Sequence, residues 1–217
     1  MRAKIIQRMA TVTLLLCLAT LPAAQAADFE KAMAHYKAGK YLDAAAEFQG
    51  LVDENPSYDF GWFMLGVCFL KTSKLADAEK NFTKAIELHP DKFQYHYNLA
   101  NSYLMRRQYR QAVTALNAAE GLATSDQQKK PFYQLRGFAL AGQKEWSDAI
   151  EDLERVKKLG ADASTLKQLG KAYFSLGYND KAVENLRASL AKNPRDGENH
   201  SLLAKALLNL GAQAQSD

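Results

Sequence analysis

Residues 59–90 read DFGWFMLGVCFLKTSKLADAEKNFTKAIELHP and contain the clearest helical pattern of the chain. Apolar or small residues recur in it at helical intervals, in two groups: Trp62, Leu65, Gly66 and Phe69, then Ala78, Phe82, Ala85 and Ile86. Side chains three and four residues apart share one face of a helix. Pro90 closes the stretch, because proline cannot continue a helix. The pattern predicts two amphipathic helices of about 13 residues each, joined by a short turn.

The same pattern recurs along most of the chain. One series of small residues has spacings of 34, 34, 37 and 33: Ala44, Ala78, Ala112, Ala149 and Ala182. A second series runs 12 residues ahead with the same spacings and one more of 34: Ala32, Gly66, Ala100, Gly137, Gly170 and Ala204. We expect paired helices to approach closely at these residues, where a larger side chain would push them apart.

This pattern resembles the tetratricopeptide repeat. Five units fall at about 25–58, 59–92, 93–126, 130–162 and 163–196, and residues 197–211 match the first helix of a sixth. The resemblance implies an all-α fold: a right-handed α-α superhelix, or solenoid, of five helix pairs with a C-terminal capping helix. Residues 212–217 are predicted to be a flexible tail.

The fourth unit departs from the pattern. In the fourth unit, Arg136 occupies a usually apolar position and follows three extra residues, Gln127-Gln128-Lys129. We expect the stacking to be locally irregular there. In the predicted capping helix, five residues match positions in the first helices of the preceding units: His200, Leu203, Ala204, Leu207 and Gly211.

Residues 1–26 have the three-part order of a secretory signal peptide. Basic residues at positions 2, 4 and 8 precede an uncharged run of 13 residues, and Ala24-Gln25-Ala26 follows. A membrane anchor is the weaker alternative, because spanning a bilayer takes about 20 apolar residues. Cys17 lies inside the apolar run, which disfavours a lipid anchor. We therefore expect cleavage near Ala26, a repeat domain over 27–211, and a periplasmic or secreted protein of a bacterial cell envelope.

Removing this segment changes the charge balance. The full chain has 28 basic and 24 acidic residues, whereas the predicted mature chain keeps 25 basic residues against the same 24. A nearly neutral chain offers no electrostatic basis for binding nucleic acid. One cysteine, Cys68, remains in the mature chain. We interpret it as a small buried residue, with an intermolecular disulfide as the alternative.

No catalytic or cofactor-binding motif stands out in the chain, and we expect neither enzyme activity nor a cofactor. The four histidines do not form a metal-ligand set, and Glu151-Asp152 is interpreted as a solvated pair. The cluster of Arg106, Arg107 and Arg110 falls in the turn of the third unit. It is interpreted as a solvated turn, with contact to an acidic partner as the alternative.

The family resemblance implies that the first helix of each pair lines a concave inner face. The residues placed on that face in the first three units are mostly apolar: Phe29, Met33, Tyr36, Phe60, Phe63, Met64, Val67, Leu70, Tyr97, Asn98, Asn101, Leu104 and Met105. Farther along, the face carries Lys167, Lys171 and Lys205. For any single residue of this set, packing between neighbouring repeats is the alternative role.

A continuous apolar surface of this kind indicates a site that another chain occupies. Asn98 and Asn101 could hydrogen-bond the backbone of a guest. We therefore hypothesise a non-catalytic protein-interaction module whose guest, a peptide or helix, has an apolar segment followed by acidic residues. The alternative is a self-assembling structural protein of the envelope. We expect a monomer or weak homo-oligomer that has no small-molecule substrate, nucleic acid or integral membrane span.

One subtype of the family grips acidic chaperone tails with a clamp of Lys, Asn and Arg. Phe29 and Met33 stand where the first Lys and Asn of that clamp would fall, which argues against such a ligand.

Overall fold

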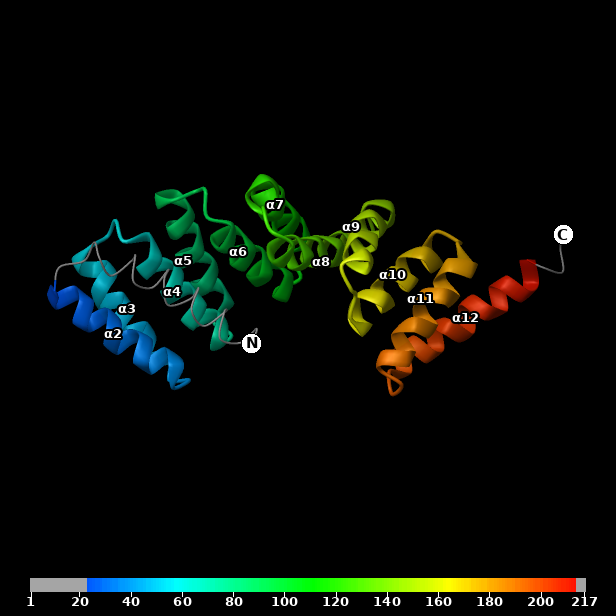
Figure 1. Cartoon of the computed structure of the whole chain (residues 1–217), viewed down its shortest axis with the longest axis horizontal. Helices are drawn as coiled ribbons and strands as arrows, with labels where there is room; N and C mark the ends of the chain where they lie inside the picture. The colour runs from blue at the N-terminus through cyan, green and yellow to red at the C-terminus, as the bar shows by residue number, and fades with distance from the viewer. Residues whose placement is uncertain (1–22, 214–217) are drawn as a thin grey trace. The chain divides into compact units, whose positions relative to one another are not determined.

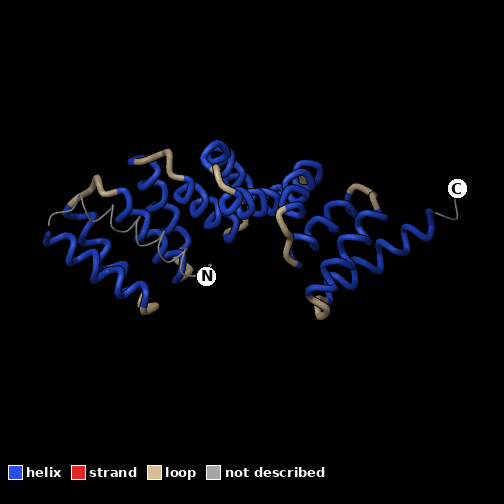
Figure 2. Tube along the Cα trace, viewed as in Figure 1, coloured by secondary structure: helices blue, strands red, loops and turns tan. Residues whose placement is uncertain are grey.

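The computed structural model describes residues 23–213 and shows helices and loops there (Figure 1, Figure 2). The predicted signal sequence up to residue 22 and the tail from residue 214 lie outside the described residues. The helices of the described part are α2 Ala23–Lys37, α3 Tyr41–Glu54, α4 Asp59–Lys71, α5 Leu75–Leu88, α6 Phe93–Met105, α7 Tyr109–Ala119, α8 Asp126–Gln143, α9 Trp146–Lys158, α10 Ala163–Ser175, α11 Asn179–Lys192 and α12 Gly197–Gln213, with a 3-10 turn, η1, at Glu120–Leu122.

The chain forms two compact units that divide between Pro90 and Asp91. In unit 1, α2 packs against α3, α3 against α4, and α4 against α5. In unit 2, each helix from α6 to α12 likewise packs against the next. The prediction of an all-α fold built from consecutive helix pairs is confirmed.

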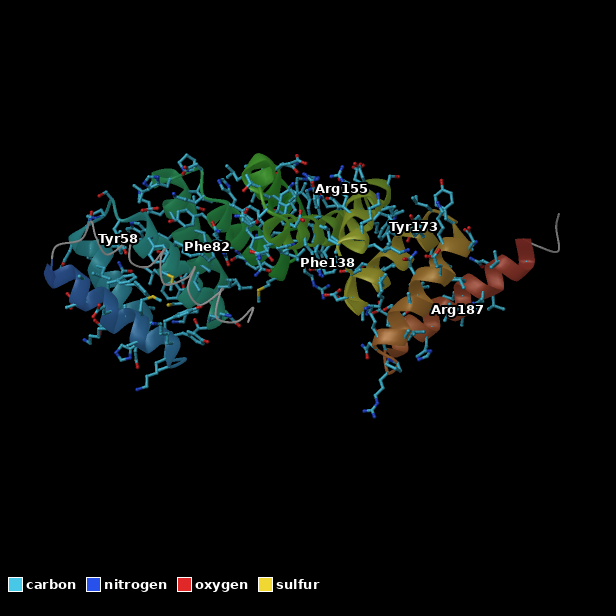
Figure 3. All side chains as sticks on the ribbon, viewed as in Figure 1. Tyr58, Phe82, Phe138, Arg155, Tyr173 and Arg187 are labelled. Atoms are coloured by element: carbon cyan, nitrogen blue, oxygen red, sulfur yellow. The ribbon has the colours of Figure 1, made fainter. Side chains whose placement is uncertain are left out.

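Small residues mark the points of closest approach within the pairs. A β-carbon on Gly66 would lie 2.7 Å from two ring carbons of Phe82. Phe82 is labelled among the side chains of unit 1 in Figure 3. A β-carbon on Gly137 would lie 2.8 Å from the Leu153 side chain, and one on Gly170 would lie 2.6 Å from that of Leu186. Real β-carbons do not approach so closely. The series of small residues therefore exists because a large side chain of the second helix fills the space beside each glycine.

The turn inside each pair contains one residue with left-handed backbone. These residues repeat at the spacing of the units: Gly39, Ser73, Arg107, Lys144 and Gly177. Glycine adopts positive φ without steric cost. Ser73, Arg107 and Lys144 have φ values of 58–66° although a β-carbon makes this backbone conformation unfavourable. The tight turn is thus common to all five pairs, although its residue type is not.

The fourth unit differs from the prediction in where its first helix begins. Helix α8 starts at Asp126, not near residue 130, and is 18 residues long. Ser125 and Gln128 form a capping box at its start. Because this cap fixes the amino-terminal end of α8, the three extra residues lie inside the helix and lengthen it, instead of forming a loop before it.

The capping helix presents a different face from the one predicted. Asn199 and Ala206 are fully buried, whereas Ala204, Leu207 and Gly211 are exposed and Leu203 is partly buried. Helix α12 packs against α11, and no later helix follows it among the described residues. The positions that would contact a second helix of the same pair therefore face outward.

Candidate functional site

The first helices of unit 1 carry a group of partly exposed apolar side chains. Met33 and Tyr36 lie on α2, and Phe60, Phe63 and Val67 lie on α4. We call these five residues the first-helix face. The rings of Phe60 and Phe63 are 5.9 Å apart, centroid to centroid, and four of the five side chains, all but Val67, pack on the unit 1 core. Their outer sides remain in contact with solvent, so this face can bury further apolar area against a partner.

Two residues predicted for this face belong to the core instead. Phe29 is fully buried, with its ring centroid 6.1 Å from those of both Phe48 and Phe60. Met64 is 6% exposed. Both side chains fill space between neighbouring helices, because their positions border the next helix as well as the inner face. The expectation that Phe29 and Met64 contact a guest is wrong for this structure.

Tyr36 lies near the turn of its own pair. Its ring is 5.5 Å from that of Tyr41, which begins α3. Burial raises the pKa of the Tyr36 hydroxyl further above its ordinary value near 10. The group is protonated at neutral pH in either case and can donate a hydrogen bond.

In unit 2, the predicted residues lie along α6. Tyr97 stacks on Phe93 at 5.6 Å and is partly buried, which raises the pKa of its hydroxyl. Leu104 is partly buried, and Met105 is 51% exposed. Met105 thus gives α6 a flexible apolar side chain in water.

Asn98 and Asn101 are both partly buried on α6. The amide of Asn98 donates to the carbonyl oxygen of Gln94 at 2.8 Å, within the same helix. That bond uses one of the two amide hydrogens and leaves the side-chain oxygen of Asn98 as an acceptor. The pair keeps hydrogen-bonding capacity for a guest.

The predicted basic lining is weaker than the sequence indicates. Lys167 of α10 pairs with Asp196 and Glu198 at 3.0 Å each, so its charge is neutralised within the fold. The carboxylate of Asp196 also accepts a hydrogen bond from the backbone N–H of Asn199 and so caps the amino-terminal end of α12. Lys171 is partly buried and Lys205 is exposed. Only these two predicted lysines remain as candidates to meet an acidic guest.

A buried ion pair that was not predicted from the sequence joins α8 and α9. Nε and Nη2 of Arg136 donate to the two oxygens of the Asp152 carboxylate, at 2.6 and 3.0 Å. Nη1 lies 3.1 Å from a carboxylate oxygen of Glu120. The Asp152 side chain is only 3% exposed, so its interpretation as solvated surface is wrong. Arg136 also lies 4.8 Å over the Phe132 ring. The one signal in the sequence was an arginine at an apolar position, and it did not reveal the partner.

Cys68 is free and fully buried, as interpreted. Burial raises the pKa of its thiol to about 11, which disfavours the reactive thiolate. Within residues 23–213, no three His, Cys, Asp or Glu side chains are grouped so that they could hold a metal ion. In the same part of the chain, no helix has the length and apolarity to span a membrane.

Comparison with known proteins identifies the repeat. A family model described as Tetratricopeptide repeat matches residues 18–59, 29–79, 63–127 and 167–216. Residues 128–166, which hold the Arg136–Asp152 pair, lie outside these segments. The most atypical unit is therefore also the one in which an ion pair replaces apolar packing.

A relative with a known name covers part of the chain. Photosystem I assembly protein Ycf3 of Prochlorococcus marinus is 31% identical over 107 residues, which is 44% of this chain and 61% of that protein. The match thus spans less than two thirds of the relative's length.

Solved structures share the fold at low identity. MamA 41-end from Desulfovibrio magneticus RS-1 superposes with a TM-score of 0.74 at 17% identity, covering 82% of this chain and 99% of that one. PilW, a type IV pilus biogenesis factor, superposes with a TM-score of 0.70 at 16% identity, covering 90% and 91%. At this identity the likeness concerns the fold alone.

Proposed function

Because this chain belongs to the tetratricopeptide repeat family, whose members bind other proteins, we propose that it is a non-catalytic protein-interaction module of the cell envelope. It captures a peptide or helical segment of a partner on the inner side of its first helices. The observation that carries this proposal is the first-helix face: Phe60 and Phe63 stay partly exposed next to a fully packed core.

The energy of capture comes mainly from apolar burial. Each large side chain that becomes fully covered contributes on the order of 1–2 kcal/mol, less the cost of ordering the partner. In unit 2, Asn98 and Asn101 supply hydrogen bonds that orient a guest backbone, and Met105 adapts to its side chains. Lys171 and Lys205 attract acidic residues of the guest.

The relatives are compatible with such a role. Ycf3 is named for photosystem I assembly, a role in which a protein acts on other proteins. This chain would hold a partner in a comparable way, and the side chains of its own first helices would select that partner.

Export is part of the proposal. Its support is the order of basic head, short apolar run and small residues in the first 26 residues. Sequencing the amino terminus of the protein from envelope fractions tests it. A first residue close to Ala27 supports export, whereas an uncleaved chain in the cytoplasm contradicts it.

Capture by the first-helix face is tested with the variant Phe63→Asp. Wild type and variant are used as bait in envelope extract, and the captured proteins are identified by mass spectrometry. We expect the variant to lose the partner that wild type retains. Circular dichroism must show the same helicity for both, since Phe63 also contacts Phe82 at 5.8 Å. Equal capture by both folded proteins would refute the site.

A second candidate is self-assembly into an envelope structure. Helix α12 favours it, because Leu207 and Leu208 are 39% and 74% exposed on a face that no described helix covers. Light scattering of the purified mature chain separates the two functions. A monomer at all concentrations excludes self-assembly, and a concentration-dependent oligomer that Leu208→Glu dissociates supports it.

A further inference from the structure

Helix α12 lacks a neighbour that other first helices of unit 2 have (Figure 1). Helix α8 packs between two second helices, α7 and α9, and α10 packs between α9 and α11. Helix α12 packs against α11 and also touches α10. Within the part of unit 2 that the structure describes, no helix takes the place of the second helix of a sixth pair.

The uncovered side of α12 is apolar. Ala204, Leu208 and Gly211 are exposed, and their spacing of four and three residues puts them on one face of the helix. Leu207 flanks that face. Leu208 is 74% exposed and Leu207 is 39% exposed, so both can bury further apolar area against a partner. We call Ala204, Leu207, Leu208 and Gly211 the end face.

The end face carries no charged residue. The charged residues of α12 are Glu198 and Lys205. A carboxylate oxygen of Glu198 lies 3.0 Å from Nζ of Lys167 of α10. Lys205 follows Ala204 by one residue, which places it about 100° round the helix from Ala204. The partner that matches this face is therefore an apolar, uncharged helix surface.

Helix α12 is held firmly on unit 2. Ala206 is fully buried and belongs to the same core cluster as Leu186 of α11. The carboxylate of Asp196 caps the amino-terminal end of the helix through the backbone N–H of Asn199. The end face thus lies on an ordered helix, so binding there costs little conformational entropy of this chain.

The contact inside the helix pairs has a fixed register. A β-carbon on Gly170 of α10 would lie 2.6 Å from the Leu186 side chain and 3.3 Å from the backbone oxygen of Ala182, both in α11. The same two contacts recur one pair earlier, at Gly137. In these pairs the first helix offers a small residue, and the second helix covers it with an alanine and, four residues later, a leucine.

Helix α12 carries both halves of this contact. Ala204 stands at the repeat position of Gly170, where a first helix is covered by its second helix. Leu208 follows Ala204 by four residues, as the covering leucine follows the alanine in α11. Phe174 follows Gly170 at the same spacing in α10, but there Leu186 already covers the small residue. In α12 both residues are exposed, so the helix is complementary to a second copy of itself.

We propose that two copies of the chain form a closed dimer through their end faces. The two α12 helices run antiparallel about a two-fold axis, Leu208 of each copy covers Ala204 of the other, and the two Ala204 residues meet near the axis. Because a two-fold axis exchanges these contacts, each copy uses the same surface and no third copy can add to it. Antiparallel helices also bring ends of opposite partial charge side by side.

The proposal rests on the self-assembly candidate above and deepens it, because it names the contact and limits the assembly to two copies. Each α12 takes the place of the second helix that the last pair of the other copy lacks. Capture by the first-helix face does not depend on it, since no residue of that face lies on α12. A failure of the dimer therefore leaves partner capture intact.

Sedimentation equilibrium measures association of the purified mature chain. We expect a reversible dimer with a dissociation constant in the micromolar range, because one helix against one helix is a small interface. Leu208→Glu should weaken the dimer at least about tenfold, because the new charge would be buried without a partner. Asn209→Glu is the matched control: it adds the same charge at the next exposed residue, about 100° farther round the helix, and should dimerise as wild type does. Circular dichroism checks that both variants keep the wild-type helicity.

Disulfide cross-linking tests the register. The mature chain has one thiol of its own, Cys68, which is buried. Ala204→Cys should give a cross-linked dimer under mild oxidation, because the two copies of residue 204 meet near the axis. Asn209→Cys, exposed but outside the end face, should stay monomeric on a denaturing gel under the same oxidation.

The outcomes that overturn the dimer differ from those that overturn the proposed functions. A monomer at about 1 mM refutes the dimer and self-assembly together, and leaves capture by the first-helix face untouched. Larger oligomers that Leu208→Glu dissociates refute the closed pair and keep self-assembly. A dimer that survives Leu208→Glu, or one that Ala204→Cys does not cross-link, assigns the association to another surface and overturns the proposal.

Discussion

The aromatic ring of Phe82 lies directly against the backbone of Gly66, and a β-carbon on residue 66 would stand 2.7 Å from two of its ring carbons. Phe82 is fully buried, as are Leu153 and Leu186, which meet Gly137 and Gly170 in the same way. This contact joins the two helices of a pair and recurs at the repeat spacing.

Replacing Gly66 by alanine therefore forces Phe82 to move. We expect Gly66→Ala to lower the free energy of unfolding by about 1–3 kcal/mol, because the surrounding core is closely packed. Chemical denaturation measures the change. Gly50→Ala is the matched control: Gly50 also lies inside a helix, but a β-carbon added there would have nothing within 4 Å, so about 0.5–1 kcal/mol of stabilisation is expected. Equal effects of the two substitutions would contradict the role of the contact.

The left-handed turn residues give a second prediction. Ser73→Gly and Lys144→Gly should each stabilise their unit by about 0.5–1 kcal/mol, since glycine adopts positive φ without a steric cost. Gly39→Ala and Gly177→Ala should destabilise by a similar amount. Thermal unfolding of the four variants checks the signs. Destabilisation by Lys144→Gly would show that the lysine side chain, not the backbone, matters there.

The Arg136–Asp152 pair gives a third prediction. Asp152→Ala leaves a largely buried guanidinium without its main partner and should cost on the order of 3 kcal/mol. Arg136→Met/Asp152→Leu removes both charges and fills the space with apolar groups, so it should unfold close to wild type. A double-mutant cycle of Arg136→Met, Asp152→Leu and the double variant, followed by chemical denaturation, measures the coupling. Additive losses in the double variant would refute a direct interaction between the two side chains.

Asp162 makes stability depend on pH. Burial acts to raise the pKa of this carboxyl, but hydrogen bonds from Thr165, Ser164 and Gln134 outweigh it and lower the pKa to about 2. Because the pKa of Asp162 is lower in the folded chain than its ordinary value near 4, the ionised carboxyl stabilises the fold at pH values above about 4. This stabilisation is lost as the pH falls toward about 2. Asp162→Asn should make the free energy of unfolding depend less on pH between about 4 and about 2.

The same residue caps α10, and its carboxylate accepts from the Thr165 backbone at 2.8 Å. Asp162→Ala should therefore cost about 1 kcal/mol at neutral pH, where Asp162→Asn, which keeps the cap, costs less. Denaturation at pH 7 and pH 3 distinguishes the two effects. An unchanged pH profile in Asp162→Asn would show that other carboxylates determine acid stability.

Cys68 should resist thiol reagents in the folded protein. Its side chain is fully buried, and burial raises the pKa of the thiol to about 11. In a Cys17→Ser background, a chromogenic disulfide reagent should label Cys68 slowly without denaturant and rapidly in guanidinium chloride. Rapid labelling of the folded chain would show that this thiol is accessible.

The helix pairs could be predicted from the sequence because the signal is local. Trp62, Leu65 and Phe69 mark a face at helical spacing, and the same spacing returns in every unit. Ser125 and Gln128 also form a local signal, a capping box, but the repeat register placed the start of α8 four residues too late. A period measured from apolar residues locates helix faces better than helix ends.

The candidate site could be predicted only in part. Phe60 and Phe63 are partly exposed, yet Phe29, at the same repeat position as Phe63, is fully buried and packs against Phe48 and Phe60. A residue at a groove position faces both the groove and the neighbouring helix. Which side it fills depends on the size of side chains contributed by other helices.

The all-α architecture, the helix pairs and the small residues at their contacts could be predicted from the sequence, because each follows from apolar periodicity within about 34 residues. Which charges are available to a partner depends on the packing of helices against one another. Lys167 is neutralised by Asp196 and Arg136 by Asp152, while Arg107 and Arg110 are exposed. Charge pairing depends on the distance between side chains of different helices, and helical periodicity carries no information about that distance.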